Sequence, residues 1–218
     1  MPNKVFIVGG PQGAYGGMFK EHGWELVDNF KKADLVQFTG GEDVTPAMYG
    51  QGAHPHTMNN EARDKYEMFM FDAALAHGIP VAGICRGGQF LNVMCGGEMW
   101  QHINNHTSSH VVMDVETGAE YMATSTHHQM MKPNIDNGGV ILAYAEECTS
   151  KEKCNEDGKI FKYSFPSKKA KSLTDKDIEV VAYPDYQALC FQPHPEFRGQ
   201  DELADWYFDY IFKQFGLG

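Results

Sequence analysis

Short apolar runs alternate with segments of helical period along the first half of the chain. Residues 61–77 predict an amphipathic helix, because their apolar positions recur at i, i+4, i+7, i+8 and i+11 and therefore share one face. Gly78 and Pro80, which follow directly, are typical of a helix end. Four apolar runs predict buried strands: 5–8, 24–27, 35–39 and 79–84. Strands that alternate with helices in this way are typical of a parallel sheet covered by helices.

The second half of the chain continues this pattern with two more helices. A short helical run is predicted over residues 90–95, and an amphipathic helix that carries Trp206, Tyr207 and Ile211 over residues 201–215. The strand-like runs of this half are 110–115, 140–145, 178–182 and 188–192. Neither an internal repeat nor a domain linker interrupts the order, so we expect a single α/β domain over residues 1–218.

One segment departs from the periodic pattern. Residues 149–176 hold eight of the fifteen lysines and have no clear period, which predicts a solvated excursion or a flexible insertion. The segment carries twice as many lysines as acidic residues, so the remainder of the chain is more acidic than the total indicates.

Composition then narrows the classes of function. The chain has 18 Lys and Arg against 29 Asp and Glu, a formal net charge of −11, and such a surface repels phosphate and disfavours nucleic acid as a partner. The sequence lacks a run of about 18 apolar residues, so a membrane span is not expected. The first residues enter an apolar strand without the features of a secretory signal. Five cysteines without paired spacing suit a reducing compartment, and the expected location is cytoplasmic.

The segment from Gly83 to Gln89 places a cysteine between a predicted strand and a predicted helix. Cys85 therefore sits on a tight turn, where glycines allow a strained backbone and the side chain projects outward. A helix N-terminus also favours the thiolate, which is the nucleophilic form of cysteine. The alternative is a buried structural thiol, which is the role expected of Cys95, Cys148, Cys154 and Cys190.

A histidine between two prolines follows the strand predicted at 188–192. The prolines restrict the backbone around His194, and Glu196 can accept a hydrogen bond from the imidazole and so orient it. Because the carboxyl ends of parallel strands meet at one edge of a sheet, His194 can approach Cys85 there. These residues predict a nucleophilic triad of Cys85, His194 and Glu196.

Three segments in this order resemble the class I glutamine amidotransferase superfamily, and within it the γ-glutamyl hydrolase-like branch of peptidase C26 type. They are FTGGEDVTPAMYG at 38–50, GICRGGQ at 83–89 and FQPHPEF at 191–197. Arg63, Asp64 and Glu67, and then STHHQ at 125–129, follow the same order. The resemblance implies a three-layer αβα fold around a mostly parallel, flavodoxin-like sheet.

The resemblance also implies a reaction and the residues for it. A Cys85 thiolate would attack the γ-amide of glutamine or of a γ-glutamyl amide, and water would hydrolyse the resulting thioester. The backbone N–H groups of Gly41 and Arg86 would form the oxyanion hole. The residues implied in substrate binding are Gln89, Thr126, His127, His128 and Gln129. Thiolate acyl transfer requires neither a metal nor a nucleotide, so no cofactor is expected.

Several of these motifs have simpler explanations. Gly40 and Gly41 could be only a turn at a strand end, and Arg63 with Asp64 could be only a pair on a helix surface. His102, His106 and His110 have a spacing that could present metal ligands on a helix, but the Asn, Ser and Thr residues between them favour a loop without metal.

Three functions fit these observations. The first is a stand-alone amidohydrolase that acts on a small-molecule substrate, and the second is a glutaminase subunit that supplies ammonia to a separate synthetase. The third is a non-catalytic binding module on the same fold, and a homo-oligomer is a possible assembly for any of them. Gly88 departs from the family pattern, which carries a larger apolar residue at that position, and residues 149–176 match nothing in it. Both departures bear on the choice of substrate.

Overall fold

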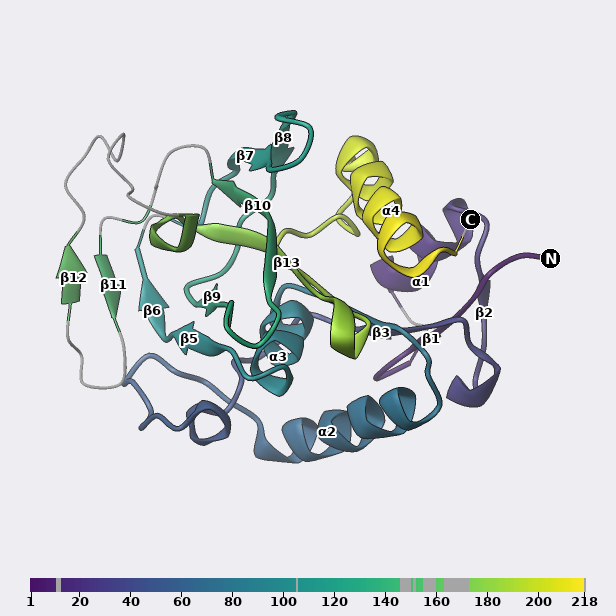
Figure 1. The fold of residues 1–218 in the computed structure, drawn as a ribbon, viewed down its shortest axis with the longest axis horizontal. Helices are drawn as coiled ribbons and strands as arrows, with labels where there is room; N and C mark the ends of the chain where they lie inside the picture. The colour runs from purple at the N-terminus through teal and green to yellow at the C-terminus, as the bar shows by residue number, and fades with distance from the viewer. Residues whose placement is uncertain are drawn as a thin grey trace.

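The computed structural model describes residues 1–10, 13–104, 106–145, 150, 152–154, 160–162 and 173–217. Its main element is a nine-stranded sheet in the order β2-β1-β3-β4-β14-β13-β10-β7-β8 (Figure 1). The strands of this sheet are β1 (Lys4–Ile7), β2 (Glu25–Leu26), β3 (Leu35–Phe38), β4 (Val81–Ile84), β7 (His110–Asp114), β8 (Glu120–Ala123), β10 (Val140–Ala145), β13 (Ile178–Tyr183) and β14 (Ala188–Phe191).

The described helices cover both faces of this sheet and give it three layers. Helices α1 (Ala14–Glu21) and α4 (Asp201–Phe215) lie on one face, whereas α2 (Glu61–Ala76) and α3 (Arg86–Met94) lie on the other (Figure 1). The αβα architecture that the resemblance implied is confirmed. Among the helices of the described ranges, none combines the length and the apolar character that a bilayer span needs.

The sheet has a parallel half and an antiparallel half. Strands β2, β1, β3, β4 and β14 pair in parallel, as the alternating pattern predicted. Beyond β14, the strands β13, β10, β7 and β8 pair antiparallel. The sequence pattern did not foresee this change of direction, because an apolar run records burial and not the direction of its partner.

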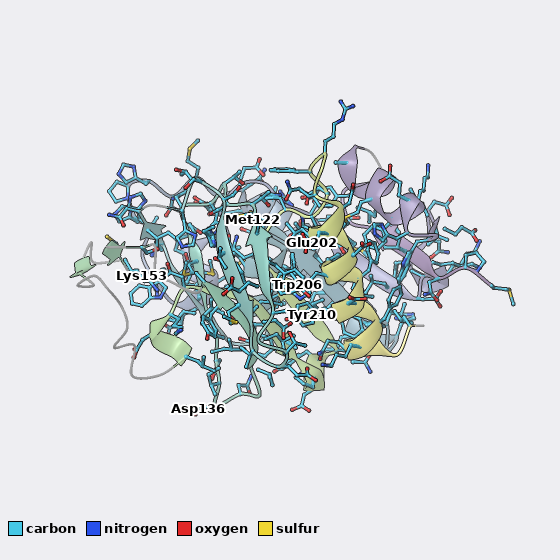
Figure 2. The ribbon with its side chains drawn as sticks, turned by 90° about the horizontal axis from the view of Figure 1, so that it is seen from above. Met122, Asp136, Lys153, Glu202, Trp206 and Tyr210 are labelled. Carbon is cyan, nitrogen blue, oxygen red and sulfur yellow. The ribbon has the colours of Figure 1, made fainter. Side chains whose placement is uncertain are left out.

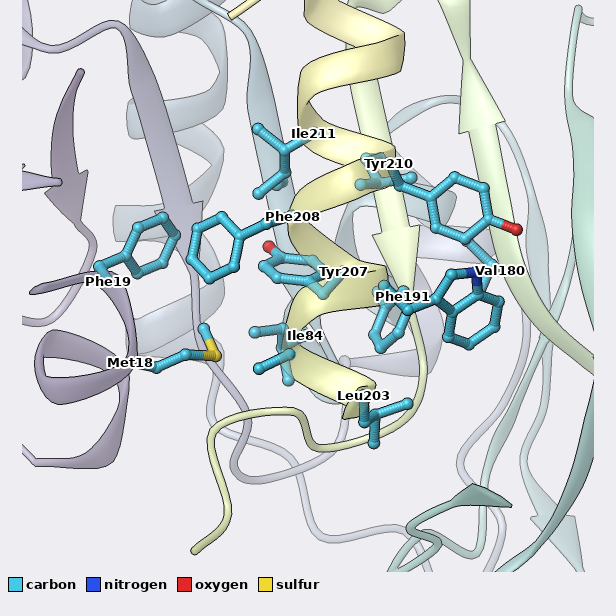
Figure 3. Close-up of a cluster of buried hydrophobic side chains, with 14 of the residues drawn as sticks. Met18, Phe19, Ile84, Val180, Phe191, Leu203, Tyr207, Phe208, Tyr210 and Ile211 are labelled. Atoms are coloured by element: carbon cyan, nitrogen blue, oxygen red, sulfur yellow. The ribbon is translucent and has the colours of Figure 1, made fainter. Parts of the chain in front are cut away.

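Aromatic side chains of α4 fill the layer between that helix and the sheet. Figure 3 shows Phe208 turned toward Phe19 of α1, with ring centroids 5.1 Å apart, and Tyr207 lying over Ile84 of β4. Trp206 and Tyr210, labelled on α4 in Figure 2, both donate to the Asp114 carboxylate, from 3.3 Å and 2.5 Å. The predicted amphipathic helix thus buries its apolar face against the sheet. Two of its side chains also donate hydrogen bonds to the buried carboxylate at the end of β7.

Helix α2 begins and ends close to where the sequence predicted. The Asn60 side chain accepts a hydrogen bond from the Arg63 backbone N–H at 3.2 Å, which caps the first turn. Gly78 follows the helix with φ +63°, a conformation that glycine adopts at little cost.

The sequence pattern misplaced or missed several short elements. Helix α3 begins at Arg86, directly after Cys85, and not at the predicted residue 90. Helix α1 was not predicted, since Gly16 and Gly17 lower its intrinsic helix propensity. The remaining described strands form two small sheets, with β5 (Glu98–Trp100) paired to β9 (Met130–Lys132) in one, and β6 (His102–Ile103), β11 (Glu152–Cys154) and β12 (Ile160–Lys162) in the other.

Most of the lysine-rich segment 149–176 lies outside the described residues. Its described parts include β11, β12 and a 3-10 turn at Leu173–Asp175. Lys153 on β11 is buried, with 1% of its surface exposed, and its ammonium forms an ion pair with Asp177 at 2.6 Å (Figure 2). The sequence predicted a solvated excursion here, whereas Lys153 is buried. Its ion pair with a carboxylate compensates the cost of removing its charge from water.

At Gly83, the backbone of helix α3 packs directly on the backbone of strand β4. A Cβ added to Gly83 of β4 would lie 2.3 Å from the Gly87 carbonyl group and 2.5 Å from the Gly88 nitrogen. These neighbours are backbone atoms, which cannot move aside as the end of a flexible side chain can. Gly17 on α1, by contrast, is exposed and has open space around it.

We expect Gly83→Ala to lower the free energy of unfolding by about 1–3 kcal/mol or more, because the added carbon overpacks a backbone contact. Gly17→Ala is the matched control and should raise it by about 0.5–1 kcal/mol through a less flexible unfolded chain. Urea unfolding followed by circular dichroism measures both. Equal stability of Gly83→Ala and the parent protein would contradict this account of the helix contact.

Candidate active site

Cys85 lies on a sharp turn between β4 and α3. Its backbone has φ 51° and ψ −114°, a left-handed conformation that is rare for a residue with a side chain. Two backbone hydrogen bonds hold the turn: the Cys85 N–H donates to the Phe191 carbonyl at 2.7 Å, and the Cys85 carbonyl accepts from the Gln89 N–H at 2.9 Å. The turn predicted from the glycine-rich segment is confirmed, and Cys85 is the residue directly before helix α3.

His194 and Glu196 follow β14, the strand that pairs in parallel with β4. The His194 Nδ1–H donates to the Glu196 carboxylate at 2.7 Å, so the second ring nitrogen, Nε2, faces away from that carboxylate. The Phe197 ring stacks on the imidazole with centroids 4.3 Å apart. Thr124 Oγ1 accepts from the His194 N–H at 2.8 Å. These contacts restrain both the plane and the position of the ring.

The structure brings Cys85 and His194 to the same place beside Gly40. A Cβ built on Gly40 would lie 3.3 Å from His194 Cε1 and 3.7 Å from Cys85 Cβ, so both side chains border this glycine. Burial by itself would lower the pKa of His194, but interactions with Cys85 and Glu196 outweigh it and raise the pKa to about 10. A protonated imidazole beside a thiol is the arrangement that stabilises a thiolate.

The loop of residues 39–41 is held against this pair from two sides. The Tyr15 hydroxyl accepts a hydrogen bond from the Gly40 N–H at 2.9 Å. Arg63 Nη2 donates to the carbonyl oxygens of Thr39 at 2.8 Å and Gly40 at 3.1 Å. Gly41 has φ +144°, and a Cβ there would lie 2.1 Å from Arg63 Nη1, so this position requires glycine. Gly41 as a donor to an oxyanion stays a prediction.

Arg86 is the first residue of α3, and its side chain and backbone have separate roles. Its guanidinium is 1% exposed and forms ion pairs with Asp64 and Glu67 of α2. Glu67 also accepts from Arg63 Nε at 2.8 Å, so Arg63 and Asp64 belong to a buried network and not to a simple surface pair. The Arg86 backbone N–H lies in the first turn of α3, where N–H groups lack an intrahelical partner.

Three glutamines, Gln89, Gln129 and Gln192, form one hydrogen-bonded group. Gln89 Nε2 donates to the Gln192 side-chain oxygen at 3.1 Å and to the Gln129 carbonyl at 3.3 Å. Gln129 is 1% exposed, and its side-chain amide donates to the Gln101 carbonyl at 3.3 Å. The structure therefore places Gln89 and Gln129, both predicted to bind substrate, in one buried group.

The other predicted substrate-binding residues differ in exposure. Thr126 is exposed, and His128 is 38% exposed with its Nε2 3.3 Å from the Asp43 carboxylate, which raises the pKa of His128. His127 instead lies in the interior, packed on His106 with ring centroids 4.8 Å apart. Burial lowers the pKa of His127 to about 4, so the ring is neutral near pH 7. His127 contacts the interior beneath the loop, whereas Thr126 and His128 reach its surface.

The sequence did not identify Tyr15, Thr124 or Gln192 as residues of this site. Tyr15 lies on the unpredicted helix α1, and burial together with the charge of Glu196 raises its pKa. Gln192 and Thr124 carry a weak signal, since Gln192 ends the strand before His194 and Thr124 precedes the STHHQ segment. Tyr15 lacks a comparable signal, because only the packing of α1 against the loop reveals it.

The fold is an α/β fold that solved glutamine amidotransferase structures share, and two of these superpose on nearly the whole chain. A glutamine amidotransferase from Thermotoga maritima covers 97% of this chain and 83% of its own, with a TM-score of 0.56 and 14% identity. The glutaminase domain of Trypanosoma brucei CTPS, solved with bound acivicin, covers 98% of this chain and 94% of its own, with a TM-score of 0.58 and 12% identity.

The family match is more specific than the fold. The Peptidase C26 family matches residues 21–196, and the chain belongs to this family. That range contains Cys85, His194 and Glu196.

Curated relatives resemble parts of the chain. The glutamine amidotransferase-like protein YvdE of Lactococcus lactis subsp. lactis is 29% identical over 135 residues, which is 52% of this chain and 57% of that protein. The gamma-glutamyl-gamma-aminobutyrate hydrolase of Escherichia coli O157:H7 is 25% identical over 173 residues, 78% of this chain and 66% of that protein. The match thus spans less than two thirds of the length of each of these relatives.

We expect iodoacetamide to alkylate Cys85 selectively at neutral pH, and His194→Gln to slow the reaction by at least about tenfold because the thiolate loses its cationic partner. Cys95 is an internal control, since burial raises the pKa of its thiol to about 12. Peptide mass spectrometry locates and times each modification. Equal rates at Cys85 and Cys95, or in the parent and the variant, would contradict the assignment of Cys85 as the activated thiol.

Proposed function

We propose that the protein is a cysteine amidohydrolase that cleaves the γ-amide of glutamine or of a γ-glutamyl amide. The observation that carries this proposal is the position of Cys85 on a strained turn beside a His194 whose pKa is raised to about 10. Membership of the Peptidase C26 family supports amide hydrolysis as the class of reaction. The curated hydrolase of Escherichia coli acts, by its name, on a γ-glutamyl amide, which supports this substrate class.

The first chemical step forms a thioester. The Cys85 thiolate attacks the γ-carbonyl carbon, and the negative charge that develops on the carbonyl oxygen is met by the backbone N–H groups of Gly41 and Arg86. The C–N bond then breaks, and the leaving nitrogen takes a proton from the His194 imidazolium. The product is the released amine, or ammonia, and a γ-glutamyl thioester on Cys85.

The second step reverses the role of His194. Its imidazole, now neutral, takes a proton from water while the water oxygen attacks the thioester carbonyl. The thiolate leaves, glutamate is released, and the imidazolium is restored. Glu196 keeps the Nδ1–H of His194 directed toward itself at 2.7 Å, so Nε2 is the nitrogen that gains and loses the proton.

Residues around Cys85 supply the groups that a glutamyl substrate needs. Gln89 and Gln129 would bind its polar atoms. Thr126 and His128 lie at the exposed part of the loop that contains Gln129. His127 would act from beneath, because its Nδ1–H donates to the Gln129 carbonyl at 2.7 Å and holds that residue in place. Local donors of this kind are needed in a protein with a net charge of −11, because the overall field repels an anionic substrate.

A glutaminase subunit that passes ammonia to a separate synthetase is the second candidate. The similarity of the fold to the glutaminase domain of Trypanosoma brucei CTPS favours it. This function uses the same chemistry at Cys85, but it predicts low turnover that rises when the partner binds. A non-catalytic binding module has less support, because a binding role does not require the strained turn at Cys85.

The purified protein should release glutamate from glutamine or from a γ-glutamyl amide without a partner, and Cys85→Ala should lower kcat by at least about a thousandfold. Cys95→Ala is the control and should retain activity. Coupled detection of glutamate measures turnover, and mass spectrometry detects the thioester on Cys85. Turnover that requires an added synthetase would favour the subunit, and full activity of Cys85→Ala would refute the proposed nucleophile.

We expect Glu196→Gln to lower kcat by about 10- to 100-fold, less than the loss of Cys85, because it orients the base and does not react. In the parent protein, turnover should fall as pH rises through about 10, since the leaving nitrogen then lacks a proton donor. Glu196 raises the pKa of His194, so its replacement should move this alkaline limb to lower pH. Alkylation of Cys85 requires no proton donor and should show no such fall; an unshifted limb would contradict the role of Glu196.

A further inference from the structure

A buried group of histidines and carboxylates lies behind the loop of residues 124–129. His106, His110 and Glu179 each offer one ligand atom, and these atoms lie within 4.8 Å of one another. The three side chains are almost fully buried, with Glu179 at 0% exposure. They come from two separate parts of the chain: His106 and His110 lie just before and at the start of β7, and Glu179 lies on β13. The reaction proposed for Cys85 uses none of them.

Hydrogen bonds turn the ring nitrogens of His106 and His110 toward Glu179. Asp177 accepts from His106 Nε2 at 2.8 Å, while His106 Nδ1 lies 3.3 Å from Ser125 Oγ and 3.8 Å from Glu179 Oε1. His110 Nε2 lies 2.9 Å from the same Glu179 oxygen, while its Nδ1 faces the Ser108 carbonyl at 3.3 Å. A carboxylate or a carbonyl on the far nitrogen is the usual outer partner of a metal-bound histidine.

His127 packs on His106 of this group, and one of its two ring nitrogens is an acceptor without a hydrogen-bond donor within the described residues. Its Nδ1 must carry the proton, because its partner is the Gln129 carbonyl oxygen at 2.7 Å, and Nε2 of the neutral ring therefore holds a lone pair. Within the described part of the chain, His127 Nε2 lacks a hydrogen-bond partner, and so does Glu179 Oε2. Both atoms are buried. Leaving such buried groups unpaired destabilises the folded state, and an additional bound group would offset that cost.

We propose that His106 Nδ1, His110 Nε2 and the Glu179 carboxylate bind one divalent transition metal ion of the zinc class. Two ligands about 2.0–2.1 Å from a tetrahedral ion lie roughly 3.3 Å apart. The observed separations from Glu179 Oε1, 2.9 Å for His110 and 3.8 Å for His106, lie on either side of that value. Two imidazoles and one carboxylate suit zinc better than calcium or magnesium, which prefer ligand sets of oxygen atoms.

The position of this ion assigns it a structural role. It would join β7 to β13 next to the loop that contains His127, whose ring packs on His106 and in turn holds the Gln129 carbonyl next to Gln89. The ion would therefore brace the substrate-binding loop from its buried side.

Protons alone could also satisfy this cluster. A His110 imidazolium can donate to Glu179 and to the Ser108 carbonyl at the same time, and the pKa of His110 is raised by its hydrogen bond to Glu179 in spite of burial. The proton-only cluster and the metal site differ in which buried atoms remain without a bonding partner. Imidazolium at His110 leaves Glu179 Oε2 unpaired within the described residues, whereas the proposed metal ion would bond to the Glu179 carboxylate.

Titration of the chelator-stripped full chain with Zn²⁺, competed against a chromophoric chelator, tests the site. We expect one equivalent to bind, with native mass spectrometry confirming a single ion, and Glu179→Gln to weaken binding by at least about tenfold. A second group of rings, His54, His56 and His102, lies near the surface and could bind zinc weakly. The double variant His54→Ala, His56→Ala is the matched control and should bind as the parent does.

Two measurements on proteins with an unaltered cluster keep the test decisive even where Glu179→Gln does not fold. Zn²⁺ should raise the Tm of the parent and of the His54→Ala, His56→Ala variant equally, because a ligand that binds only the folded state stabilises it. Co²⁺ should give the strong visible absorption of a four-coordinate site in both. Absence of binding to the parent, or its loss in the surface variant, would overturn the proposal and leave a cluster satisfied by protons.

Discussion

The parallel pairing of β4 with β14 is the constraint on which the candidate site depends. Because the two strands run in the same direction, with Ile84 opposite Phe191, the residues that follow each strand reach the same edge of the sheet. Cys85 and His194 are brought together in this way although they lie far apart in the sequence. The same pairing admits helix α3 only because Gly83 and Gly88 have no side chain, since a Cβ at either would meet backbone atoms within 3 Å. The position of Cys85 and the packing of helix α3 therefore depend on the same strand pairing.

Buried charges connect this edge to the neighbouring helix. Arg86, at the start of α3, pairs with Asp64 and Glu67 of α2, and Arg63 links Glu67 to the carbonyls of the loop beside Cys85. Burial lowers the pKa of Arg86 to about 10, which leaves it charged near neutral pH. Such a network orders a loop at a high cost of desolvation, and removal of one member leaves an uncompensated charge. The loop that contains Gly41 follows β3 and is therefore held both by Arg63 of α2 and by Tyr15 of α1.

The sequence predicted the long elements well and the short ones poorly. Helix α4 matches its predicted bounds, because its apolar face is continuous and packs on the core. Helix α1 was missed, since two glycines hide a helix that packing against Trp24 and Phe208 stabilises. The spacing of His102, His106 and His110 in the sequence could not show which of them lie together in the folded protein. His102 lies on β6, away from the pair that meets Glu179.

Local chemistry is what the sequence by itself determined: a cysteine at a turn between strand and helix, a histidine held between prolines, and a glutamate that follows it. These motifs can be recognised in the sequence alone because each consists of residues within a few positions of one another. Only the tertiary structure decided which distant groups meet. It turned His127 inward toward His106, joined Tyr15 to Gly40, and placed Glu179 against His110. The physical reason is that such contacts arise from strand pairing and helix packing, which the hydrophobic pattern predicts as burial but not as neighbours.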